Sequence, residues 1–239
     1  MSLILNIETT SEVCSVGLAL NGELIASRET IDPNSHSRLL TVFIDEIFKE
    51  AGKTVSDIDA IAISKGPGSY TGLRIGTSVA KGLCYSLGKP LISVDTLQSI
   101  AYGILFKSGL KNDFELEFFI CPLIDARRME VYTGLYDKDL NCLKEPYAHI
   151  FEEVSFKELL EKNIVLFGGS GMEKAKSILT GNNAIFVDDI KASALYMAGL
   201  SLSSFEKKEF VDMVYFEPFY LKEFIAGKSK GIPGLTPRL

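Results

Sequence analysis

Two stretches of the chain combine hydroxyl or glycine residues in patterns that could bind phosphate. Glu8, Thr9 and Thr10 end an apolar run, and a turn there could direct hydroxyls and backbone amides at an anion. Gly168-Gly169-Ser170-Gly171 lies between a predicted strand and a predicted helix, whose N-terminus attracts negative charge. Both stretches are also consistent with ordinary turns. A weakly bound ATP or ADP would contact Thr9, Thr10, Gly168, Gly169 and Gly171.

A third glycine turn, Gly66-Pro67-Gly68, lies between an apolar β-branched run and a predicted helix over residues 71–87. Its spacing matches neither a Walker loop nor the Gly-x-Gly-x2-Gly fingerprint, so a tight turn is favoured over a phosphate cradle. Gly72, Gly76 and Ala80 then form a stripe of small residues. Because glycine weakens a helix by roughly 1 kcal/mol relative to alanine, the stripe indicates that another segment approaches this helix closely.

Histidine and cysteine are too scattered to form a local metal motif. His36 and His149 are more than 100 positions apart, so no pair of imidazoles shares one helix or loop. The four cysteines include no Cys-x2-Cys pair, and each has apolar neighbours typical of a small core residue: Cys14, Cys84, Cys121 and Cys142. We therefore expect no disulfide, no metal and no intrinsic cofactor.

The composition is that of a folded protein in an aqueous compartment. Of the 239 residues, 46% are hydrophobic and 23% are charged, and no run approaches the roughly 20 apolar residues of a membrane span. The formal net charge of −6 argues against strong nucleic-acid binding by the chain alone. The first residues carry no basic region and lead directly into a strand, so we expect a cytoplasmic protein.

The order of predicted elements indicates two related lobes of a mixed α/β fold. Residues 1–106 contain an antiparallel meander with an Asn21-Gly22 hairpin signal, followed by alternating helices and strands. Residues 107–226, beginning in a polar hinge, repeat the opening pattern, and their last helix could pack back on the first lobe. Residues 227–239, rich in glycine, proline and cations, predict a flexible tail.

Two helices carry more apolar or small surface than one core requires. In the predicted helix Ser35–Ala51, apolar residues cover about 180°, whereas a stripe of roughly 100° is enough to face a core. Either this helix is wedged deeply within its own lobe or part of it faces a second chain. The second interpretation predicts a partner interface that includes Leu39, Phe43, Ile47, Gly72, Gly76 and Ala80.

Five segments spread over nearly the whole chain carry a family resemblance: Ile7–Thr10, Ser35–Ser37, Gly66–Gly76, Asp125–Tyr132 and Glu217–Leu221. Together they resemble the bacterial TsaB (YeaZ) family. The resemblance implies an actin-like, Hsp70-like ATPase (ASKHA) fold of two related lobes. It also implies a non-catalytic subunit that helps to form threonylcarbamoyladenosine beside the anticodon of tRNA.

The same resemblance implies the partners. A TsaD-like subunit transfers the threonylcarbamoyl group, a TsaE-like ATPase joins the pair, and tRNA is contacted only within the complex. A like chain could occupy the partner surface and give a homodimer. The catalytic homologue carries a His-x3-His metal pair where this chain has Thr96 and Ile100, so no catalytic residue and no metal are expected here.

Two other functions compete with this interpretation. A small-molecule kinase of the same fold would grip ATP with Thr9, Thr10 and the Gly168 loop, and would use Glu8 or Asp125 as its base. The short second lobe leaves little chain for its substrate pocket. A metallopeptidase ranks lower, because the two histidines are distant and no His-Glu-x2-His is present.

Overall fold

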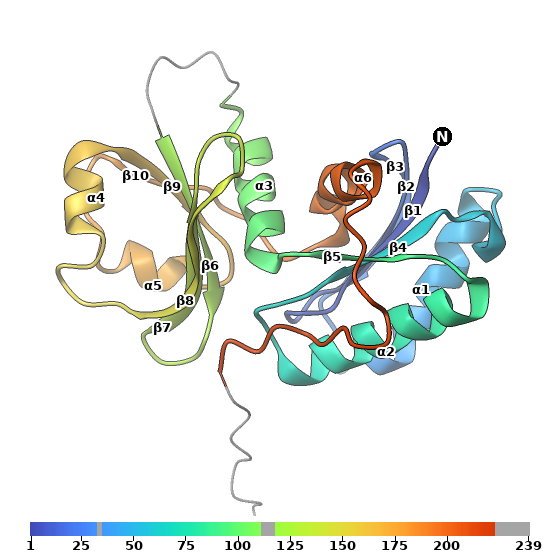
Figure 1. Ribbon diagram of the computed structural model, residues 1–239. Helices are drawn as coiled ribbons and strands as arrows, with labels where there is room; N and C mark the ends of the chain where they lie inside the picture. Colours follow the sequence, from blue (N-terminus) through green and yellow to red (C-terminus); the bar gives the residue numbers. More distant parts are fainter. Residues whose placement is uncertain (33–34, 111–117, 223–239) are drawn as a thin grey trace, which may run out of the picture.

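The computed structural model describes residues 1–32, 35–110 and 118–222. Part of the predicted hinge and the whole predicted tail, residues 227–239, lie outside the described residues. Two five-stranded sheets form the centres of two lobes that lie side by side (Figure 1). Among the helices in the described part of the chain, none is long and apolar enough to cross a membrane.

The first sheet combines an antiparallel meander with two parallel strands. Its order is β3-β2-β1-β4-β5. Asn21 and Gly22 both adopt positive φ, 50° and 83°, in the turn before β3, which confirms the hairpin that their residue types predict. The strands are β1 (Leu3–Glu8), β2 (Cys14–Leu20), β3 (Glu23–Thr30), β4 (Ala60–Ser64) and β5 (Leu91–Val94).

The second sheet repeats this topology. Its order, β8-β7-β6-β9-β10, again places three antiparallel strands beside two parallel ones. The strands are β6 (Phe118–Asp125), β7 (Glu130–Tyr136), β8 (Cys142–Ile150), β9 (Ile164–Gly168) and β10 (Ala184–Phe186). The duplicated strand order confirms two related lobes, each built on a mixed β-sheet, as expected from the sequence.

Helices cover both faces of the first sheet because side chains alternate along its strands. Leu3, Leu5 and Ile7 of β1 contribute to the core beneath α1 (His36–Glu50) and α2 (Tyr70–Leu87). Ile4 points to the opposite face, into the core that includes Met197. The elements on that face are η2 (Ala194–Tyr196) and α6 (Ala198–Glu206), while η1 (Val55–Asp57) leads into β4.

The second sheet is also covered on both faces, and this packing changes the predicted lobe boundary. Leu97, Ile100 and Ile104 of α3 (Thr96–Ser108) share a core with β6 and β9, so α3 belongs to the second lobe. The boundary predicted after residue 106 therefore lies too late, because the core changes where β5 ends. The opposite face is covered by α4 (Lys157–Lys162) and α5 (Met172–Lys176), which lie at the left in Figure 1, on the side away from the first lobe.

Capping residues fix the ends of the helices nearest the lobe boundary. The Ser69 hydroxyl accepts a hydrogen bond from the Gly72 amide, and Gly88 ends α2 with a φ of 62°. The Asp95 carboxylate accepts from the Leu97 and Gln98 amides at 2.9 and 3.2 Å and so caps α3. Both helices thus begin at defined residues beside the junction of the two lobes.

A C-terminal strap, defined here as residues 211–222, runs from the first sheet along α2 to the second lobe. It begins where the Val211 amide donates to the Leu91 carbonyl of β5 at 2.9 Å. It then passes α2, where the Lys81 ammonium donates to the Val214 carbonyl at 3.2 Å. Lys222 finally pairs with Glu130 of β7, so the strap reaches the second lobe.

The cysteines divide into a buried set and one exposed residue. All four are free thiols, and Cys14, Cys84 and Cys121 are buried as predicted. Cys142 is exposed because β8 is an edge strand with most of its side chains toward solvent, which corrects the expectation of a core position.

Candidate functional site

A cleft of about 760 Å3 opens between the lobes. Its first-lobe wall is formed by the turn after β1, the start of α1 and the start of α2. Its second-lobe wall is formed by the end of β6, the following turn and Ser170. The strap completes it with Tyr220, Leu221 and Lys222. The cleft therefore collects residues from six separate parts of the sequence.

The first-lobe wall is held by direct contact between the turn after β1 and the start of α2. The Thr9 hydroxyl donates to the Gly72 carbonyl at 2.9 Å, and the Ser69 amide donates to the Thr10 carbonyl at 2.6 Å. A Cβ added to Gly68 would meet the Thr10 backbone, and one added to Gly72 would overlap the Thr9 carbonyl oxygen. Glycine is required at both positions because no side chain fits between these segments.

This packing removes part of the predicted partner interface, because it buries three of its residues within the chain. Gly72, Gly76 and Ala80 are buried, and Gly76 faces the Thr9 hydroxyl and the Ile63 side chain. The close approach indicated by the small-residue stripe is thus made by the chain's own β1 turn and core, so these residues are not available to another chain. Ile47 is fully buried as well. Leu39 and Phe43 remain half-exposed on α1.

The structure also does not bring the five predicted nucleotide contacts together at the cleft. Of the five residues, Thr10 lines the cleft, whereas Thr9 is fully buried with its hydroxyl bonded to Gly72. Gly169 has a φ of 112° and lies against the Leu123 backbone, and the Gly171 amide donates to the Leu123 carbonyl at 3.0 Å. Gly168 pairs with Pro122 inside the sheet. The glycine loop therefore joins β9 to β6, and Ser170 is its contribution to the cleft.

Glu8 places a carboxyl group beneath the cleft. It is fully buried, and its Oε1 accepts from the Thr10 amide at 2.5 Å. Burial raises the pKa of Glu8, and the hydrogen bond from the Thr10 amide offsets only part of that effect. The carboxyl group therefore keeps its proton to a higher pH than an exposed glutamate does.

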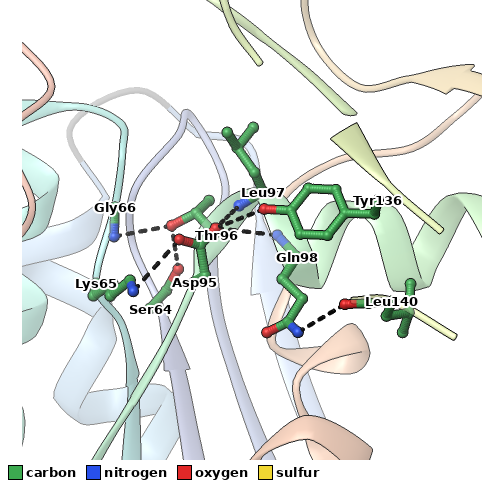
Figure 2. A network of polar contacts seen from close by, with 9 residues as sticks. All are labelled: Ser64, Lys65, Gly66, Asp95, Thr96, Leu97, Gln98, Tyr136 and Leu140. Atoms are coloured by element: carbon green, nitrogen blue, oxygen red, sulfur yellow. Dashed lines mark hydrogen bonds and ion pairs between the residues drawn. The ribbon is translucent and has the colours of Figure 1, made fainter. Parts of the chain in front are cut away.

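A polar network joins the lobes at the start of α3 (Figure 2). Asp95 Oδ2 lies 3.5 Å from the Lys65 ammonium, and the Tyr136 hydroxyl of β7 donates to Asp95 Oδ1 at 3.3 Å. Burial raises the pKa of Asp95, and the nearby Lys65 charge opposes that rise. Gln98 adds a 3.1 Å hydrogen bond from its amide group to the Leu140 carbonyl.

Thr96 and Ile100 serve structural purposes in this region. The Thr96 hydroxyl lies 2.6 Å from the Ser64 hydroxyl and accepts from the Gly66 amide at 3.0 Å (Figure 2). Ile100 is buried in the core between α3 and the second sheet. These two positions therefore tie the Gly66 turn to α3 and fill the core.

The two histidines occupy different environments in different lobes. His36 Nε2 lies 3.2 Å from the Val13 carbonyl oxygen at the edge of the cleft. His149 Nε2 lies 3.0 Å from the Ser155 hydroxyl, and burial together with the Lys144 charge lowers the pKa of His149. Within residues 1–32, 35–110 and 118–222, no group of three His, Cys, Asp or Glu side chains is placed to hold a metal ion.

Sequence reasoning missed most of the aromatic and cationic side chains at the cleft. Tyr70 of α2 and Tyr220 of the strap have ring centroids 5.0 Å apart, and the Arg74 guanidinium lies 4.2 Å from the Tyr70 ring centroid. Arg127 and Lys222 line the cleft from the second lobe and the strap. The available signal was the grouping of Tyr220 and Arg127 in motifs that carry the family resemblance, which gave no role for either.

Comparison with known proteins agrees with this architecture. A family model described as TsaD, tRNA N6-adenosine threonylcarbamoyltransferase, matches residues 27–211. The tRNA threonylcarbamoyladenosine biosynthesis protein TsaB of Escherichia coli K12 is 29% identical over 97% of this chain and 98% of its own length. TsaB of Bacillus subtilis is 34% identical over 59% of this chain and 58% of its own length. Among solved structures, YeaZ from Pseudomonas aeruginosa has 26% identity and a TM-score of 0.79, covering 92% of this chain and all of that one.

Proposed function

We propose that this chain, which belongs to the TsaD threonylcarbamoyltransferase family and within it to the TsaB/YeaZ proteins, is a non-catalytic subunit for threonylcarbamoyladenosine formation in tRNA. The match to TsaB along nearly the full length of both chains supports the pathway. The chain would act in the cytoplasm, because the relatives that it matches are named for tRNA modification.

The assignment as non-catalytic rests on Thr96 and Ile100. The resemblance places a metal-binding His-x3-His pair at these positions in the catalytic homologue. Here one side chain is a buried hydroxyl bonded to Ser64 and Gly66, and the other fills the core. Neither side chain offers a ligand comparable to imidazole, so threonylcarbamoyl transfer requires another subunit.

The partner that supplies this chemistry would be a TsaD-like subunit, with a TsaE-like ATPase joining the pair and tRNA bound only within the complex. The α1 surface is the proposed contact. Leu39 and Phe43 are half-exposed there, and Val42 is 43% exposed. A second copy of the chain would compete for the same surface. Nucleotide bound by the isolated chain would be weak, because the glycine loop uses its backbone within the sheet.

Reconstitution tests the proposal. The full chain is mixed with a TsaD-like subunit, a TsaE-like ATPase, tRNA and the small substrates, and modified adenosine is measured in the tRNA. Product should require both the chain and the TsaD-like subunit, and the chain alone should give none. Formation of product by the chain without the TsaD-like subunit would contradict the non-catalytic role.

A matched pair of variants tests the surface. Phe43→Asp on α1 should weaken binding of the TsaD-like subunit by at least about tenfold, because it places a charge in an apolar contact. Phe106→Asp is the control, since Phe106 is 70% exposed on α3 of the other lobe. Equal affinities of both variants and the wild type would place the interface elsewhere.

A further inference from the structure

The turn between β6 and β7 carries two consecutive arginines in a backbone conformation that disfavours them. Arg127 and Arg128 have φ values of 70° and 49°. Positive φ brings Cβ close to the carbonyl oxygen, so glycine and asparagine are the residues usually found there. The side chains at these positions therefore cost stability, and such strain is typical of positions kept for function.

Hydrogen bonds hold the turn firmly in this conformation. The Arg127 amide donates to Asp125 Oδ1 at 2.6 Å, and the Glu130 amide donates to the Arg127 carbonyl at 3.1 Å. Lys174 reinforces it, with its ammonium 3.0 Å from Asp125 Oδ2 and 2.8 Å from the Glu130 carbonyl oxygen. The backbone is thus fixed before any ligand binds, which lowers the entropy lost on binding.

The guanidinium groups themselves are left without partners. Both arginines are exposed, and neither guanidinium makes a hydrogen bond, ion pair or ring contact with any residue in the described part of the chain. The nearby carboxylates are already neutralised, since Asp125 pairs with Lys174 and Glu130 pairs with Lys222. By contrast, Arg28 and Arg38 are both paired with carboxylates.

The position of the turn indicates the shape of its ligand. Arg127 lines the cleft together with Lys222 of the strap and with Ser69 and Thr71 of the first-lobe wall. Arg128 is exposed but lies outside the residues that line the cleft. An extended anion such as a polymer can pass Arg127 at the cleft mouth and continue onto the outer surface to reach Arg128 as well.

We propose that Arg127 and Arg128 form a phosphate-binding site for an RNA strand that enters the mouth of the cleft. A planar guanidinium can donate two parallel hydrogen bonds to one phosphate, and contacts to phosphates position RNA without reading its sequence. The choice of tRNA as the RNA rests on the proposed function. Because the whole chain has a net negative charge, this contact adds to the tRNA affinity of the complex. It does not make the isolated chain a strong RNA binder.

The test measures tRNA affinity of the assembled complex between 50 and 200 mM salt. Arg127→Gln/Arg128→Gln removes two phosphate contacts and should make the slope of log affinity against log salt shallower by about 1.4. Between 50 and 200 mM salt, the variant should therefore lose roughly sevenfold less affinity than the wild type loses. Arg127→Lys/Arg128→Lys should keep most of the slope. The control is Lys157→Gln/Lys162→Gln, which removes two exposed cations on α4 and should leave the slope unchanged.

A third variant separates a structural role from a binding role. Arg127→Asn/Arg128→Gly suits positive φ, so it should raise the melting temperature while it weakens tRNA binding as much as the glutamine pair does. An unchanged salt slope in both the glutamine and the asparagine-glycine variants would overturn the proposal. So would displacement of the tRNA by AMP at matched ionic strength, which would assign the arginines to a small-anion site.

Failure of the complex to form would contradict the proposed function and not this site. The salt series would then be run on the full chain alone from the lowest practical salt, where weak electrostatic binding of an unmodified tRNA transcript is strongest. A slope reduced in the glutamine pair and unchanged in the α4 control would support the site, and equal slopes would reject it.

Discussion

Thr9 and Gly72 are in direct contact: the Thr9 hydroxyl donates to the Gly72 carbonyl at 2.9 Å, and no side chain fits between the two residues. This contact fastens the turn after β1 to the first turn of α2, and both segments line the cleft or support its wall. The packing of β1 against α2, and with it the first-lobe wall of the cleft, therefore depends on the absence of a side chain at Gly72.

Gly72→Ala should destabilise the protein by about 2 to 4 kcal/mol, because the new methyl group overlaps the Thr9 carbonyl oxygen and the backbone must move. Gly82→Ala in the same helix is the control. Nothing lies within 4 Å of a Cβ added there, so the change should be neutral or stabilise by up to about 1 kcal/mol. Urea unfolding measures both, and equal stabilities of the two variants would contradict the packing described.

The sequence predicted those parts of the fold that depend on local signals. Asn21-Gly22 predicted a hairpin that the structure has, and the helix predicted over residues 71–87 corresponds to α2 (Tyr70–Leu87). β8 (Cys142–Ile150) was missed because it is a largely exposed edge strand that contains Pro146 and lacks a clear apolar alternation. β10 has three residues, too few for any periodic pattern.

The candidate site was harder to predict because its residues meet only through tertiary structure. Tyr220 lies against Tyr70, 150 positions earlier, since the strap returns along α2. The small-residue stripe did indicate a close approach, but periodicity cannot say which segment makes it. The approaching segment is the turn at Thr9, and the glycines thus serve the chain's own core.

One thiol, that of Cys142, should react with an aromatic disulfide reagent in the native protein faster than the other three, although burial and the Glu145 charge raise its pKa. Cys142 is exposed, whereas Cys14, Cys84 and Cys121 are buried, and burial raises the pKa of Cys84 to about 12. We expect one fast equivalent of released thiolate, and the remaining three only after unfolding. Cys142→Ser should abolish the fast phase, and a fast phase that persists in this variant would show that a buried thiol is accessible.

The strap should be held partly by the pair between Lys222 and Glu130. Their side chains are 49% and 18% exposed, so a double-mutant cycle with Lys222→Glu and Glu130→Lys should give a coupling free energy of only about 0.5 kcal/mol. Hydrogen exchange gives a second measure. Amides of residues 212–222 should exchange faster in either single variant and regain protection when the charges are exchanged, and no recovery would mean that the ion pair does not hold the strap.

Glu8→Gln tests the buried carboxyl group beneath the cleft. Because burial raises the pKa of Glu8 in the folded state, the folded protein binds a proton that the unfolded chain releases at a lower pH. The contribution of Glu8 to stability is therefore full below the ordinary glutamate pKa of about 4.3 and is lost as pH rises toward the raised pKa. Glutamine can still accept from the Thr10 amide and carries no charge, so the variant should lack this loss.

At pH 7 we expect Glu8→Gln to be more stable than the wild type, because the wild type has lost stabilisation from its buried carboxyl group at that pH and the uncharged amide has not. At pH 4 the two proteins should be nearly equal. Glu12→Gln, at an exposed position four residues after the end of β1 in the same turn, should change neither value appreciably. Thermal unfolding between pH 4 and pH 8 measures the difference. A Glu8→Gln protein that is less stable at pH 7 would mean that the ionised carboxylate is stabilised where it lies, and that Glu8 belongs among the charged groups of the cleft.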